Sequence, residues 1–212
     1  MSDEDTVSNI NISVIEERIN LLALGNQEVG KTTFILRFTE NTFKQLYLTT
    51  CGMDMQIKYI TLPDNKNYKI FFYDTAGEER FKSITFSVLK NSDGIILMYD
   101  ITNRKSFESI SGWMESINDK KGKNCPIVLV GNKSDLSEKR VISKKEGENL
   151  ANKYKLNFFE TSNKTGKNIE ESCLKLIDII LEKQEFKKEK DKKTHRLSKN
   201  VKINKKNNNC QC

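Results

Sequence analysis

The sequence lacks the features that mark membrane-spanning, secreted or disulfide-stabilised proteins. No apolar run approaches the roughly 20 residues that a transmembrane helix needs, and residues 1–13 are too polar and acidic for a secretory signal. The five cysteines are too scattered to form a disulfide framework or a zinc site. This spacing fits a reducing cytosol, and we interpret Cys51, Cys125 and Cys173 as packing residues.

The net charge of +7 comes from the C-terminal segment. From Lys183 onward the sequence has eleven Lys or Arg residues and three acids, a charge of +8, so that residues 1–182 carry −1. A near-neutral body argues against a nucleic-acid-binding face, whereas a basic tail suits an anionic surface. Residues 185–209 are rich in Lys and Asn, which predicts disorder, and the only histidine, His195, is expected to be solvated there.

The chain is organised around residues 25–32, which read G-x-x-x-x-G-K-T. This segment follows the apolar run 19–24 and precedes the helix-like run 33–38, which is the context that a phosphate loop requires. Glycine lets the backbone wrap a polyphosphate with its N–H groups pointing inward, and the helix N-terminus adds partial positive charge. Lys31 would reach the β and γ phosphates, and the Thr32 hydroxyl would ligate Mg²⁺. The motif predicts a nucleoside triphosphate but leaves the base open.

Apolar runs alternate with amphipathic segments, which predicts an α/β fold with a six-stranded, mostly parallel sheet flanked by helices. The expected strands are residues 19–24, 53–62, 68–73, 94–99, 127–130 and 157–161. After the helix at 33–38, helices are expected at residues 107–120, 143–155 and 169–184. We predict a flexible arm at residues 1–17, one domain at 18–184 and a disordered basic tail at 185–212.

Three further polar motifs follow predicted strands, and parallel strands bring their carboxyl ends to one rim. Asp74-Thr75-Ala76-Gly77 offers an acid that assists Mg²⁺ and a glycine that lets a γ-phosphate approach closely. In Asn132-Lys133-Ser134-Asp135, a carboxylate could pair with two donors of guanine that adenine does not present. Residues 161–164 could supply backbone N–H groups to the base carbonyl. Each motif alone is also an ordinary polar turn.

Together these motifs resemble a Ras-superfamily small GTPase. The resemblance rests on GNQEVGKT, a Thr50 between the first helix and the second strand, DTAG, NKSD and ETSNK in this order, and it covers residues 18–184. The stretches TCGMDM (50–55), KIFFYDTAGEERFKSIT (69–85) and LMYDIT (97–102) are similar to the Rab family, which regulates vesicle traffic. The ending Cys210-Gln211-Cys212 matches the Rab C-x-C double prenylation signal.

The resemblance implies a P-loop small G domain that binds GTP or GDP with Mg²⁺. It places Thr32, Thr50 and Asp74 at the metal, and Lys31, Thr50 and the position of Glu78 in catalysis. Phe43 stands where family members stack an aromatic edge against guanine, although a core phenylalanine is equally expected from its residue type. The implied nucleotide contacts are Gly25, Asn26, Gln27, Glu28, Val29, Gly30, Lys31, Thr32, Thr33, Phe43, Thr50, Asp74, Gly77, Asn132, Lys133, Asp135, Ser162, Asn163 and Lys164.

The resemblance also implies two switch loops, around Thr50 and at residues 78–84, which order on GTP binding and relax on hydrolysis. An effector-facing apolar patch would be formed by Met53, Met55, Phe71 and Tyr73. Simple strand packing is the alternative reading of these four, equally expected for Phe71. Residues 86–93, FSVLKNSD, depart from the usual Rab pattern, so we expect a divergent effector surface.

Three positions in the catalytic region also depart from the family. Glu78 replaces a catalytic glutamine, and an ionised carboxylate accepts hydrogen bonds but cannot donate one. Gln27 and Glu28 replace small residues of the phosphate loop, where bulk crowds the attacking water. We therefore predict slow intrinsic hydrolysis. The alternatives are that Glu78 orients water adequately, or that the protein is a non-hydrolysing GTP-bound recruitment module. A P-loop ATPase or nucleotide kinase is disfavoured by NKSD.

By resemblance, the expected partners are an exchange factor, a GTPase-activating protein, a dissociation inhibitor and effectors, with no nucleic acid and a monomeric state. Prenyl groups on Cys210 and Cys212, together with the basic tail, would hold the protein on a membrane, because two chains or one chain plus a basic patch bind stably. Plain exposed thiols are the alternative. We expect the cytoplasmic face of endomembranes with a cytosolic pool.

Overall fold

The computed structural model describes residues 17–43, 53–63, 65–75 and 82–207, and for 82–86 and 191–207 it describes the backbone. Several sequence-based predictions fall outside these residues and stay predictions. They concern the N-terminal arm at 1–16 and Thr50, Cys51, Gly77, Glu78, Cys210 and Cys212.

The sheet has six strands in the order β2-β3-β1-β4-β5-β6. All neighbouring strands pair in parallel except β2 and β3, which pair antiparallel around the short turn between them. The predicted α/β fold with a mostly parallel sheet is therefore confirmed. The strands are β1 (Glu17–Leu24), β2 (Met53–Thr61), β3 (Asn67–Thr75), β4 (Gly94–Asp100), β5 (Ile127–Asn132) and β6 (Asn157–Glu160).

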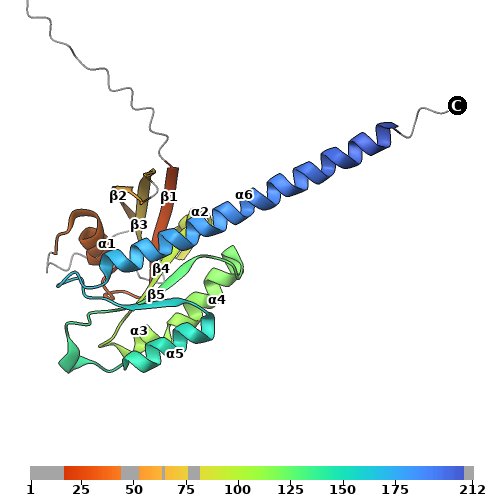
Figure 1. Ribbon diagram of the computed structural model, residues 1–212. Coiled ribbons are helices and arrows are strands. Elements are labelled where there is room, and N and C mark those ends of the chain that lie inside the picture. Colours follow the sequence, from red (N-terminus) through yellow and green to blue (C-terminus); the bar gives the residue numbers. More distant parts are fainter. Residues whose placement is uncertain (1–16, 44–52, 64, 76–81, 208–212) are drawn as a thin grey trace, which may run out of the picture.

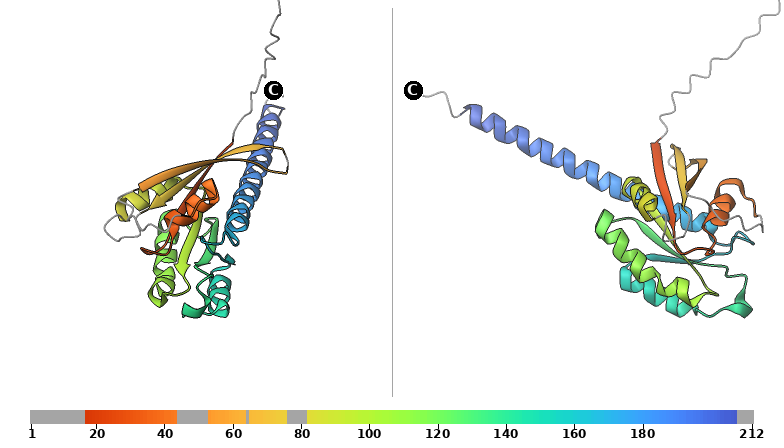
Figure 2. Two further views of the ribbon diagram at one scale, coloured as in Figure 1. Left: turned by 90° about the vertical axis from the view of Figure 1, so that its left-hand side faces the viewer. Right: turned by 180° about the vertical axis from the view of Figure 1, so that it is seen from behind.

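Helices cover both faces of the sheet (Figures 1 and 2). On one face, Phe34 and Phe38 of α1 and Leu176 of α6 pack in one apolar cluster. On the other, Leu89 of α2 and Ile117 of α4 belong to a second cluster. The helices are α1 (Lys31–Glu40), α2 (Lys82–Asn91), α3 (Arg104–Glu108), α4 (Ile110–Lys121), α5 (Lys144–Tyr154) and α6 (Ile169–Asn207), with a 3₁₀ turn at Ser137–Lys139.

Two helical features differ from the sequence-based expectation. The sequence analysis places no helix at α2, and the predicted switch loop at residues 78–84 overlaps its first turn. The expected helix at 107–120 is split in the structure, because α3 ends and α4 begins on either side of Ser109. Asn103 caps α3 by accepting a hydrogen bond from the Ser106 N–H, so the first short helix has its own start signal.

The last helix is longer than predicted. Its packed face, made of Ile169, Cys173, Leu176, Ile177 and Ile180, is buried as expected. The sequence predicts a disordered tail at residues 185–212, whereas the backbone of α6 continues as a helix to Asn207 and projects away from the domain (Figures 1 and 2). Lys and Glu are good helix formers, so a composition that cannot build a core is still compatible with a solvated helix. No described helix is long and apolar enough to span a bilayer.

Candidate functional site

The predicted phosphate loop lies between β1 and α1, and its two outer glycines are each required by close contacts. Gly25 has a φ of 142°, and a Cβ there would lie 2.2 Å from the Met98 carbonyl oxygen of β4. Gly30 has a φ of 98°, and its Cβ would lie 2.5 Å from Nδ2 of Asn132. Any side chain at either position would displace backbone or a buried amide. The glycines thus serve packing within the chain as well as access for a phosphate.

Lys31 occupies the centre of this loop. Its Nζ donates to the carbonyl oxygens of Gly25 at 3.0 Å and Asn26 at 2.8 Å. The side chain is buried, and this burial lowers the pKa of the ammonium to about 8, an effect that the Asp74 carboxylate partly opposes. The ammonium is therefore held against the loop carbonyls, where an added phosphate would favour its charged form.

Thr32 and Asp74 meet at the start of α1 and the end of β3. The Thr32 hydroxyl donates to Oδ2 of Asp74 at 2.5 Å, and Asp74 is buried. Next to it, the Thr75 hydroxyl donates to the Ala23 carbonyl oxygen at 3.1 Å, which ties β3 to β1 at this end. Hydroxyl and carboxylate oxygens are ligands that Mg²⁺ accepts, usually as one or two protein groups beside substrate phosphates. This pair fits that role.

Asn132 joins three loops on the rim. Its Nδ2 donates to the Val29 carbonyl oxygen at 2.9 Å, and its Oδ1 accepts from the Thr161 hydroxyl at 3.1 Å. The side chain is fully buried. Both ends of the amide are therefore used within the protein, and Asn132 holds the phosphate loop against the loops that follow β5 and β6.

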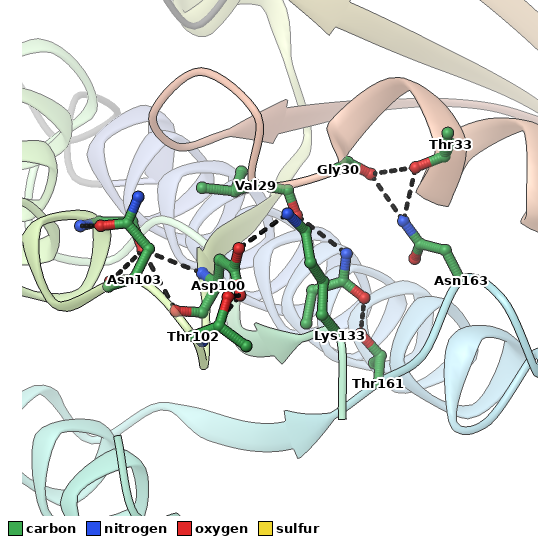
Figure 3. Close-up of polar contacts among 11 residues, drawn as sticks. Val29, Gly30, Thr33, Asp100, Thr102, Asn103, Lys133, Thr161 and Asn163 are labelled. Atoms are coloured by element: carbon green, nitrogen blue, oxygen red, sulfur yellow. Dashed lines mark hydrogen bonds and ion pairs between the residues drawn. The ribbon is translucent and has the colours of Figure 1, made fainter. Parts of the chain in front are cut away.

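Asn163 makes a second link of the same kind. Its Nδ2 donates to the Gly30 carbonyl oxygen at 2.9 Å and to the Thr33 hydroxyl at 2.7 Å (Figure 3). Sequence reasoning placed Asn163 among the residues that contact the base. In the structure its Nδ2 reaches the phosphate loop and the first turn of α1, while its buried Oδ1 has no hydrogen-bond partner among the described residues.

Lys133 and Asp135 lie in the loop after β5. Lys133 has a left-handed backbone with φ 67°, and its Nζ pairs with Oδ2 of Asp100 at 2.7 Å (Figure 3). The other Asp100 oxygen accepts from the N–H and the hydroxyl of Thr102 at 2.8 and 2.7 Å. Sequence analysis missed Asp100, although its place at the end of β4, beside Asn132 in the register, was a usable signal.

The carboxylate of Asp135 is positioned from the last loop of the rim. Its Oδ1 accepts from the Ser162 hydroxyl at 2.6 Å, and the Ser162 hydroxyl oxygen accepts from the Thr165 N–H at 3.1 Å. A hydroxyl held in this way orients the carboxylate plane. The acid keeps its acceptor capacity on the second oxygen, which suits the recognition of paired donors.

An Arg–Glu pair lies behind these base-side loops. Arg140 contacts Glu160 through both arms of its guanidinium, at 2.5 and 3.1 Å, and it also donates to the Ile142 carbonyl oxygen at 3.0 Å. The Glu160 carbonyl oxygen in turn accepts from Nδ2 of Asn168 at 2.8 Å. These contacts fix the end of β6, where residues 161–164 begin. The ETSNK motif therefore contains a structural acid as well as residues that face the site.

The remaining predicted residues are less constrained. Gln27 and Glu28 are exposed, and Glu28 has a left-handed backbone with φ 62°. Phe43 is 38% exposed rather than a core residue. The Lys164 side chain is exposed, while its carbonyl oxygen accepts from Arg37 at 3.4 Å. The structure thus brings together Lys31, Thr32, Asp74, Asn132, Lys133, Asp135, Ser162 and Asn163, and leaves Gln27, Glu28, Phe43 and Lys164 at the margin.

Comparison with known proteins finds similarity to Ras and Ras-related proteins. The sequence model of the Ras family matches residues 20–182. Ras-related protein Rab-10 of Diplobatis ommata is 43% identical over 163 residues, which cover 77% of this chain and 81% of the relative. Rab-13 of Rattus norvegicus is 42% identical, covering 76% and 79% of the two chains. Rab-8B of Homo sapiens is 41% identical, covering 77% and 78%.

Proposed function

The chain belongs to the Ras family and is a Rab-like small GTPase, and on that premise we propose that it is a Mg²⁺-dependent GTP/GDP switch in vesicle trafficking whose intrinsic hydrolysis is slow. One observation carries the proposal. The Lys31 ammonium, the Thr32–Asp74 pair and the Asn132–Asp135 loop lie on one rim of the sheet, held together by hydrogen bonds. Phosphate, metal and base contacts are therefore available to one nucleotide.

Each group has a role that follows from its chemistry. The phosphate-loop N–H groups and Lys31 bind the phosphate oxygens, and Thr32 holds Mg²⁺ with assistance from Asp74. When bound, the metal neutralises charge on the β and γ phosphates. Asp135 accepts hydrogen bonds from the ring N–H and the amino group of guanine, and the stem of Lys133 lies along the base. Thr50 and Gly77 complete the contacts to the γ-phosphate.

Hydrolysis is the step where this chain departs from its family. A glutamine at position 78 would orient the attacking water by donating and accepting, whereas the Glu78 carboxylate only accepts and adds negative charge. Gln27 and Glu28 add bulk beside the phosphates, and their exposed side chains leave the backbone cradle intact. Binding is therefore retained while intrinsic turnover falls. An activating protein that contributes an arginine and a glutamine would restore it.

The second candidate function is a GTP-bound recruitment module that does not hydrolyse its nucleotide. It is favoured by Glu78, Gln27 and Glu28, which work against hydrolysis but leave the backbone cradle for the nucleotide intact. The face for effectors would include the apolar side chains of Met53, Met55 and Ile57, which are 43%, 41% and 40% exposed. Pairing of β2 with β3 places Met55 beside Tyr73 and Ile57 beside Phe71, so the patch continues across both strands. Effectors would bind this face in either function.

Membrane attachment belongs to the same proposal. Prenyl groups on Cys210 and Cys212 would anchor the chain to the cytoplasmic face of endomembranes, and the Lys-rich end of α6 would add electrostatic attraction to anionic lipids. A dissociation inhibitor would maintain a cytosolic pool, and an exchange factor would load GTP at the membrane.

Single-turnover hydrolysis of GTP with Mg²⁺ tests the switch. We expect slow hydrolysis by the protein alone, strong stimulation by an activating domain that supplies arginine and glutamine, and a faster intrinsic rate in Glu78→Gln. No turnover in any condition, with tight GTP binding retained, would establish the recruitment module instead. Fast unaided hydrolysis by the natural chain would contradict the role assigned to Glu78.

Base selectivity tests the nucleotide site itself. The chain should prefer GDP over ADP by roughly 10⁴-fold, because adenine would leave the Asp135 carboxylate without its donors. Asp135→Asn should shift the preference toward xanthosine diphosphate, whose ring carries a carbonyl where guanine carries an amino group. Asp119→Asn, an equal change of charge at an exposed position of α4, is the matched control. Equal binding of ADP and GDP would refute the proposed function.

A further inference from the structure

We propose that Trp113, the only tryptophan of the chain, is a positioning residue of the phosphate loop, acting through Asn26 to slow nucleotide release. The inference rests on the proposed function, since it assigns a residue of α4 to the same nucleotide site. Trp113 lies far from the loop in sequence, and no motif points to it. Its indole Nε1 donates to Oδ1 of Asn26 at 2.9 Å.

The Asn26 amide is held at both ends, which fixes its orientation. Its Nδ2 donates to the Ser109 hydroxyl oxygen at 2.9 Å, and the Ser109 hydroxyl itself donates to the Lys105 carbonyl oxygen at 2.7 Å. An indole N–H can only donate, so the amide oxygen must face Trp113 and the amide nitrogen must face Ser109. The relay therefore has a single direction, from Trp113 through Asn26 to Ser109.

Asn26, the central residue of this relay, also contacts the ammonium that would bind phosphate. The Asn26 carbonyl oxygen accepts from Nζ of Lys31 at 2.8 Å, so the residue fixed by Trp113 is also one that positions the ammonium. On one side of Asn26, Gly25 is wedged against β4, and on the other side Gln27 and Glu28 are exposed. The Asn26 side chain thus attaches the loop to the helical layer formed by α3 and α4.

The other end of the relay is rigid. Ser109 lies at the junction of α3 and α4. Its carbonyl oxygen accepts a hydrogen bond from the backbone N–H of Trp113 at 3.1 Å, within the first turn of α4. The Trp113 ring packs against the apolar cluster that contains Tyr99 and Ile110, with Phe107 on the same cluster. A ring held by packing can direct its N–H at a fixed point. Loss of that N–H would leave Asn26 free to move with the exposed part of the loop.

Dissociation of a fluorescent GDP analogue, chased with excess GDP, tests the relay in the full-length chain. Trp113→Phe removes the indole N–H and keeps an aromatic ring, and Asn26→Ala removes its partner. Each should raise the dissociation rate about fivefold, the effect of one neutral hydrogen bond. The double variant should dissociate no faster than Asn26→Ala, because the two residues act through one contact. Phe107→Leu, a packing change in the same cluster, should stay within about twofold of the natural chain.

Two further readouts separate positioning from a general loss of stability. The natural chain should bind GDP more tightly than GMP. This gain in affinity should be smaller in Trp113→Phe and Asn26→Ala, because a loosened loop weakens contacts to the β-phosphate. Phe107→Leu should keep the full gain. In the natural chain, GDP binding should change the emission of Trp113, and Asn26→Ala should abolish that change. Unchanged dissociation, additive effects in the double variant, or an emission change that survives Asn26→Ala would each overturn the relay.

The inference and the proposed function fail in different ways. Failure of the natural chain to bind GDP would refute the proposed function. The relay would then be judged on the protein alone, where Asn26→Ala should shift the emission maximum of Trp113 because its N–H loses a partner. An unshifted maximum would refute the relay as well.

Discussion

Strands β4 and β2 belong to one sheet but are used in opposite ways. Every residue of β4 and of its neighbour β5 is buried, and the polar groups of the nucleotide rim begin where these strands end. No residue of the edge strand β2 is buried. Four of its apolar residues, Met53, Met55, Ile57 and Tyr59, are exposed. On its other face, Gln56, Lys58 and Ile60 are half-buried. Buried strands hold the site rigid, and the edge strand displays side chains that a partner could cover.

The largest difference in stability should appear when one aliphatic side chain is truncated in a buried strand and one in the edge strand. Leu129→Ala in β5 removes a fully buried side chain and should lower the free energy of unfolding by about 3 kcal/mol. Ile57→Ala in β2 removes a side chain that is 40% exposed, and it should cost less than about 1 kcal/mol. Urea denaturation of both variants measures the difference. Equal losses would show that β2 is packed as firmly as β5.

Removal of a charged side chain should likewise cost more stability where its partner is buried than at the exposed β2–β3 edge. Arg140→Ala leaves the Glu160 carboxylate, only 12% exposed, without its bidentate partner, and it should cost about 2 kcal/mol of unfolding free energy. At the β2–β3 end, the Lys69 ammonium lies over the rings of Tyr59 at 5.2 Å and Phe71 at 5.4 Å. Lys69→Ala should cost about 0.5 kcal/mol, as exposed cation–π contacts do. Thermal unfolding measures both losses, and the midpoint temperature should fall further in Arg140→Ala than in Lys69→Ala.

The exposed part of the phosphate loop should contain removable strain. Glu28 adopts φ 62°, a conformation that costs a non-glycine residue about 1 kcal/mol. Glu28→Gly should therefore raise the free energy of unfolding by up to about that amount, offset in part by the greater freedom of glycine in the unfolded chain. Asn41, which is also left-handed at φ 54°, provides the comparison, because Asn tolerates this region and Asn41→Gly should gain less.

The smallest expected effect comes from the exposed ion pair between Arg104 of α3 and Glu146 of α5. Hydrogen bonds from Arg104 and from Ser143 hold the pKa of Glu146 at about 2, below its ordinary value of 4.5. The unfolded chain therefore binds a proton first, and the contribution of Glu146, complete above about pH 5, is lost as the pH falls toward 2. Stability of Glu146→Gln should fall less over that range than stability of the natural chain. A parallel decline in both would show that the pair is screened by solvent.

Much of the fold was readable from the sequence because its signals are local. The apolar runs located all six strands, and residues 25–32 identified the phosphate loop by glycines that no other residue can replace. The buried face of α6 followed from its helical period. These features depend on residues within a few positions of one another, so they can be predicted from the sequence alone.

Other features could not be read from the sequence. The extension of α6 past Gln184 and the break at Ser109 are local, but composition and period do not distinguish a solvated helix from a tail or one helix from two. Whether Asn163 faces a base or the phosphate loop depends on where β6 brings it against Gly30.

By itself, the sequence determined which chemical groups this protein possesses and on which strands and loops they stand. Only the tertiary structure decided which of those groups touch, because contacts such as Trp113 with Asn26 and Lys133 with Asp100 join segments that are far apart in the chain. The physical reason is that the direction of a hydrogen bond is set by packing around both partners, and packing is a property of the assembled layers rather than of any one segment.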